Sequence, residues 1–165
     1  MTANKTARPP AKPKKRLTAA EKAKRRVAIA KDVLAQLTAR RFKAQSGMYI
    51  VATGKKTCKV CALGALFVAG VEPDVKKAEQ VAEESVYLIR KSLRSLFTTP
   101  VLEDVEAWFE GSDPMDWEER YGMWLPRDTR RSDFYRKHPN DTKRMRLIMQ
   151  NIVDNKGTFK PELLV

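Results

Sequence analysis

The spacing of apolar positions predicts a mainly helical domain that begins near residue 18. Thr18-Ala19-Ala20-Glu21 is a capping box, in which the Thr hydroxyl accepts the N3 amide and the Glu side chain reaches back to the cap. Apolar residues then recur at steps of three and four, which is the period of a helix. The helix should end near Ala44, before Ser46-Gly47.

A short hairpin and a buried helix should follow. Met48–Ala52 and Thr57–Val60 have strand character, and Thr53-Gly54-Lys55-Lys56 offers the turn between them. The segment Cys61–Gly70 is apolar on all sides, so it reads as a short buried helix in which Gly64 permits close approach of a neighbour.

Three further helices are predicted in the second half of the chain. One stripe runs from Pro73 to about Phe97 as a single long helix. A second helix begins at Thr99-Pro100 and ends at Gly111, and the last begins at Asn140 or Asp141. Between them, residues 112–140 should form short helical turns packed by aromatic side chains, because a structureless loop of that length is unusual.

Residues 1–17 form a separate segment by composition. They are rich in Lys, Arg and Pro, carry no acid, and have no large apolar residue between Met1 and Leu17. Such a segment buries too little surface to offset its ordering entropy, so we expect a disordered basic arm. The predicted fold is therefore mainly α, with one small β-hairpin in a single domain over 18–165 and a disordered basic arm over 1–17.

The charge of the chain is divided unevenly. The formal net charge is +13, yet residues 1–61 hold seventeen Lys and Arg against only Glu21 and Asp32. The remaining residues hold sixteen Lys and Arg against eighteen Asp and Glu. This asymmetry points to a polyanionic partner, without identifying it.

Cations gather where the first helix begins. Cations in the first two turns oppose the helix dipole, at a cost of about 0.3–1 kcal/mol each at low salt, and a bound phosphate backbone would reverse that cost. An acidic protein surface or a merely solubilising tail are the alternatives. The eight candidate nucleic-acid-binding residues here are Lys12, Lys14, Lys15, Arg16, Lys22, Lys24, Arg25 and Arg26.

A second basic stretch lies near aromatic residues. Arg130 and Arg131 precede Phe134 and Tyr135, and aromatics interleaved with Arg can stack on single-stranded bases. We include both arginines as nucleic-acid-binding candidates. The alternative is that these aromatics form a lid over the core.

Cys58-Lys59-Val60-Cys61 is a C-x-x-C motif just before a helix. It could be a redox pair or half of a zinc site. A structural zinc site needs four ligands, however, and His138 is the only histidine. We therefore expect no metal and no cofactor, with Cys61 buried as a small hydrophobe.

Eight carboxylates fall between Glu103 and Glu119 without a Lys or Arg among them. Glu103, Glu106 and Glu110 repeat at i, i+3 and i+7, which places them on one helical face. We expect a solvated face rather than a metal site. Docking of the basic arm on this face, or a catalytic metal, are the alternatives.

The sequence favours a binding protein over an enzyme. It lacks the Walker A, G-x-G-x-x-G, G-x-S-x-G and H-E-x-x-H motifs. It also has no secretory signal and no apolar run of about 18 residues, so we expect no membrane partner and a reducing cytoplasm.

The segments Cys58–Leu66 and Leu96–Gly111 together resemble small uncharacterised phage and prophage proteins with a C-x-x-C-A-L-G-A-L core motif. The resemblance covers about half the chain and implies a helical domain that acts in a bacterial host cytoplasm. It implies no activity.

From these observations we predict a non-enzymatic accessory protein that binds nucleic acid or a nucleoprotein. The runner-up is an inhibitor that binds a host enzyme or defence complex. A metal-dependent enzyme that uses the 103–119 carboxylates comes third.

Overall fold

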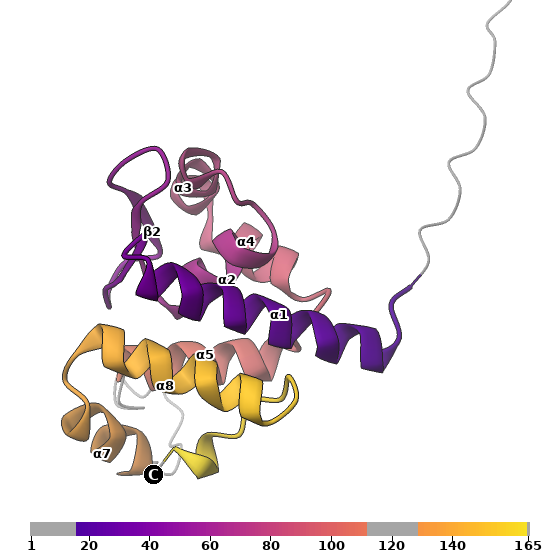
Figure 1. Cartoon of the computed structure of the whole chain (residues 1–165), viewed down its shortest axis with the longest axis vertical. Helices are drawn as coiled ribbons and strands as arrows, with labels where there is room; N and C mark the ends of the chain where they lie inside the picture. The colour runs from indigo at the N-terminus through magenta and orange to yellow at the C-terminus, as the bar shows by residue number, and fades with distance from the viewer. Residues whose placement is uncertain (1–15, 112–128, 165) are drawn as a thin grey trace, which may run out of the picture.

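Helix α1 (Ala19–Thr38) crosses the whole molecule between two layers of helices (Figure 1). The computed structural model describes residues 16–111 and 129–164, so nearly all of the predicted arm lies outside the described residues. The mainly helical fold class predicted from the sequence is confirmed. The Thr18 capping box is present, with Thr18 N donating to Glu21 Oε2 at 2.7 Å. Helix α1 packs against α8 (Asp141–Asp154) and α2 (Ala62–Gly70).

The first helix is shorter than predicted, because it ends at Thr38 rather than near Ala44. Arg40 takes a left-handed φ of 57°, and Phe42–Ala44 forms a strand, β1. Phe42 and Ala44 are buried while Lys43 is exposed, so this segment follows the period of two that a half-buried strand needs. A strand of three residues was too short for the sequence pattern to reveal.

Three strands make one small sheet in the order β1-β3-β2. Strands β2 (Ile50–Ala52) and β3 (Cys58–Val60) pair antiparallel, which confirms the predicted hairpin. Strand β1 adds to β3 in parallel, with Phe42 opposite Cys58 and Ala44 opposite Val60. One face of the sheet thus joins the core, and the other carries Lys43, Lys59 and Val51.

Helix α2 lies buried behind the sheet, and its close approach depends on Gly64. A Cβ atom at Gly64 would collide with the backbone carbonyl of Tyr49 and with the Ile50 side chain. Ala62–Val68 are all buried. This confirms the predicted buried helix and the role given to its glycine.

The predicted long helix over residues 73–97 is wrong, since it is two helices. Helix α3 (Val75–Glu84) ends at Ser85, whose extended backbone (φ −172°, ψ 124°) starts α4 (Val86–Leu93). The Ser85 hydroxyl accepts from Tyr87 N at 3.2 Å and caps the second helix. The break lets α3 pack on β2 while α4 packs on α2.

Helix α5 (Thr99–Glu110) begins and ends where the sequence predicted. Gly111 closes it in the left-handed conformation, with φ 67°. Helix α7 (Thr129–Lys137) agrees with the short helical turns expected before residue 140, and its Phe134 packs against Trp108 at 5.3 Å between ring centroids. Trp117, Tyr121 and Trp124 lie outside the described residues. Asn140 caps α8, and a 3-10 turn, η1 (Pro161–Leu163), follows.

Candidate functional site

The first turns of α1 carry exposed cations at the edge of the molecule. Arg16, Lys24 and Arg25 are exposed and Lys22 is half-buried. In Figure 1 this end of α1 lies at the right of the molecule. Of the predicted binding residues, Lys12, Lys14 and Lys15 lie outside the described residues. Of the remaining candidates in this segment, Arg16, Lys24 and Arg25 face solvent.

Arg26 does not belong to this exposed set. Its Nε donates to the Gly157 carbonyl at 2.5 Å and its NH1 to the Leu96 carbonyl at 2.8 Å. Its guanidinium also lies 6.0 Å from the centroid of the Phe97 ring. The prediction that Arg26 binds nucleic acid is therefore corrected: its donors tie α1 to two distant segments of the fold.

One acid and two exposed cations lie in the first two turns of α1. Glu21 is the one acid in the first turn of α1, and its carboxylate accepts from Thr18 N. That backbone hydrogen bond lowers the pKa of Glu21, and the Thr18 hydroxyl and the nearby Arg25 lower it further against a smaller effect of burial. Within the described residues, Lys24 and Arg25 make no ion pair.

Arg130 and Arg131 are not brought to the start of α1. They lie on α7, which packs on α5 and sits at the lower left of Figure 1, away from the N-terminal end of α1 at the right. Arg131 NH2 lies 3.5 Å from Asp104 Oδ1, and Arg130 also has an interaction partner. The two predicted basic groups are thus separate surfaces.

The acidic face of α5 is mostly turned inward, so the expected solvated face is wrong for two of its three members. Glu106 Oε1 accepts from the Tyr49 hydroxyl at 2.5 Å, and its other oxygen pairs with Arg90. Glu110 Oε2 accepts from Gly47 N at 2.7 Å. Only Glu103 is exposed. These carboxylates hold the loop before β2, which sequence spacing alone could not show.

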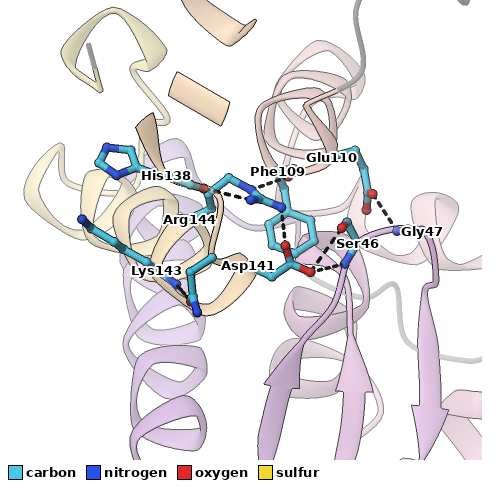
Figure 2. Close-up of polar contacts among 9 residues, drawn as sticks. Ser46, Gly47, Phe109, Glu110, His138, Asp141, Lys143 and Arg144 are labelled. Carbon is cyan, nitrogen blue, oxygen red and sulfur yellow. Dashed lines mark hydrogen bonds and ion pairs between the residues drawn. The ribbon is translucent and has the colours of Figure 1, made fainter. Parts of the chain in front are cut away.

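Arg144 organises the same region from α8 (Figure 2). This fully buried side chain donates to the Phe109 carbonyl at 3.0 Å and the His138 carbonyl at 2.8 Å, and it pairs with Asp141. Asp141 in turn accepts from Ser46 N at 2.8 Å. The network joins α5, α8 and the loop that precedes β2. Removing one member would leave a buried charge without its partner, which is strongly destabilising.

Both cysteines are buried free thiols. Burial raises the pKa of Cys58 to about 11, with a smaller contribution from Glu79. Burial also raises the pKa of Cys61 to about 12, although Gly64 N donates to its sulfur at 3.4 Å. The predicted burial of Cys61 is confirmed. Protonated, enclosed thiols are the reverse of the exposed thiolates that redox pairs use.

No three His, Cys, Asp or Glu side chains of the described residues come together as a metal site. The acids Asp113, Asp116, Glu118 and Glu119 lie outside the described residues, so the cluster over 103–119 is seen only in part.

The sheet carries a second group of basic residues that the sequence pattern does not predict. Lys43 and Lys59 are Cα partners on β1 and β3, and both belong to the face of the sheet that is not buried. The sequence does contain a sign of this basic surface, because residues 33–71 include no Asp or Glu. The sequence pattern predicts that the first helix includes residues 42–44, so it does not predict that Lys43 pairs with Lys59 in a sheet.

Comparisons of the chain with protein-family models, with curated proteins and with solved structures find no match. Among the described residues, no helix is both long enough and apolar enough to cross a membrane.

Proposed function

We propose that this chain is a non-enzymatic accessory protein that binds nucleic acid, or a nucleoprotein, through its basic N-terminal segment. The observation that supports this most directly is the exposed pair Lys24 and Arg25. Both lie in the first two turns of α1, where a cation opposes the helix dipole. Neither has an ion-pair partner among the described residues.

A phosphate backbone fits this arrangement better than a small ligand. Exposed Arg16, Lys24 and Arg25 follow Lys12, Lys14 and Lys15 in the sequence, so these six cations occur at intervals over fourteen residues. Spread cations neutralise successive phosphates and release counterions, which gives affinity with little sequence preference. The sequence resemblance to phage and prophage proteins adds the proposal that the protein acts in the cytoplasm of an infected bacterium.

The test is the salt dependence of binding to labelled 20-base-pair DNA and RNA duplexes, followed by fluorescence anisotropy. Replacing Lys14, Lys15, Lys24 and Arg25 by Gln should weaken binding to all sequences alike. The slope of log K against log salt should fall in magnitude by about four, roughly one for each phosphate that the variant no longer neutralises. Arg26 is left intact because its replacement would damage the fold.

The matched control removes four exposed positive charges elsewhere, at Lys76, Lys77, Lys137 and Lys143. It should change the slope much less than the first variant. Equal effects of the two variants, or binding that ignores salt, would contradict the proposal. A protein partner that survives nuclease treatment in a pulldown would favour the runner-up, an inhibitor of a host enzyme.

A further inference from the structure

The sheet exposes a basic face that no other part of the proposed function uses. Its inner face is buried through Phe42, Ala44, Ile50, Cys58 and Val60. On its outer face Lys43 is exposed, Lys59 is half-buried and Val51 is 37% exposed. Because side chains alternate along strands, these three residues point away from the core together.

Lys43 and Lys59 are neighbours in register on two adjacent strands. Strands lie about 4.8 Å apart, and like charges directly opposite each other destabilise a sheet. Neither lysine makes an ion pair within the described residues. A sequence selected only for stability would place an acid opposite one of them.

Three acids of the described residues that lie near the sheet have other partners. Glu79 accepts from Ala52 N at 2.8 Å at the edge of β2. Glu110 and Asp141 bind the backbone of the loop before β2. More cations surround the face instead: Arg41 directly precedes β1, and its carbonyl accepts from Cys58 N at 2.9 Å. Lys55 and Lys56 are exposed in the hairpin loop.

The exposed side of α1 links this face to the N-terminal segment. Lys24, Ala28, Lys31 and Ala35 are all exposed at steps of three and four, so they form one stripe. Asp32 borders this stripe, is half-buried, and accepts from the Gln36 side chain at 3.1 Å. Figure 1 shows the N-terminal end of α1 and the sheet at opposite ends of the helix. At 1.5 Å per residue, the thirteen residues from Arg25 to the end of α1 at Thr38 span about 20 Å.

We propose that the outer face of the sheet, centred on Lys43 and Lys59, is a second phosphate-binding surface that contacts the same nucleic acid as the N-terminal segment. This inference rests on the proposed function. A separation of about 20 Å corresponds to about 6 base pairs, because one turn of duplex spans about 34 Å in 10 base pairs. A 20-base-pair duplex is therefore long enough to contact both surfaces at once.

The first experiment measures anisotropy with a 20-base-pair DNA duplex and a 20-base-pair RNA duplex. Replacing Lys43 and Lys59 by Gln should reduce the salt slope for the DNA duplex by about two. Comparing the change in salt slope for the DNA duplex with that for the RNA duplex shows which of the two nucleic acids this surface prefers. The double variant Lys137→Gln and Lys143→Gln is the charge-matched control.

A second variant separates binding from folding. Lys59→Glu places a carboxylate opposite Lys43, so the melting temperature should be kept or raised while binding of the 20-mer weakens further. An unchanged slope in the Lys43→Gln/Lys59→Gln variant, with binding still weakened by changing Lys14, Lys15, Lys24 and Arg25, would overturn this inference alone. If binding is unaltered both by the changes on the sheet and by those in the N-terminal segment, then both this inference and the proposed function are wrong.

Discussion

Adjacent basic residues in this chain have opposite roles, and burial decides between them. Arg25 and Arg26 follow one another on α1, yet one is exposed and the other donates to two backbone carbonyls. A guanidinium group is well suited to binding two backbone carbonyls at once, because its donors are fixed in a planar fork. Arg144 uses the same property at full burial. A count of positive charges therefore overstates the number available to a ligand.

Arg26→Ala should lower the free energy of unfolding by about 1–3 kcal/mol, because the carbonyls of Gly157 and Leu96 lose charge-assisted donors. Arg25→Ala should change it by less than about 0.5 kcal/mol. Urea denaturation of the two variants measures both values. Arg26→Lys should recover only part of the loss, since a single ammonium cannot reproduce the fork. Equal stability of the two Ala variants would show that the Arg26 hydrogen bonds contribute nothing.

At the level of elements, close packing of backbones fixes the relation of α2 to the sheet. Gly64 lies against the carbonyl of Tyr49, and Cys61 N donates to that same carbonyl at 3.1 Å. The apolar run over 61–70 predicts burial of this helix, but only the tertiary structure shows which backbone it meets.

Gly64→Ala should destabilise the protein by about 1–3 kcal/mol or more, because the new methyl group meets backbone atoms that cannot rotate away. Gly54→Ala is the control. Its Cβ would meet the hydroxyl of Thr57, which can turn aside, so the cost there should be small. Thermal unfolding compares the two variants. A melting temperature for Gly64→Ala as high as that of the control would disprove the tight approach.

At the level of the whole molecule, three weak acids in and beside the core hold their protons more firmly than they would in water. Burial raises the pKa of Tyr49, and its hydrogen bond to Glu106 raises it further. Cys58 and Cys61 have raised pKa values for the same main reason. Each group keeps its proton to higher pH in the folded protein than in the unfolded chain, so folding and alkaline pH are linked.

The free energy of unfolding should therefore fall as pH rises above about 9. The unfolded thiols ionise near that ordinary value, while the folded thiols stay protonated to about 11 and 12. Their stabilisation is complete below pH 9 and is lost as pH rises through the folded values. Urea titrations between pH 8.5 and 11 should show a downward slope above pH 9 that is reduced in Cys58→Ala/Cys61→Ala. An equal slope in the variant would rule out the thiols as its cause.

Elements with local signals could be predicted from the amino-acid sequence. Capping boxes, helical stripes and glycine ends depend on neighbours in the chain, so α1's start, the hairpin, α2, α5 and α8 could be predicted. The break at Ser85 and the strand β1 could not, because α3 and β1 form where they do through partners far along the chain. The same holds for the candidate site. Charge composition located the basic N-terminal segment, but pairing of β1 with β3 was needed to set Lys43 beside Lys59, and folding alone turned Arg26 and Glu106 inward.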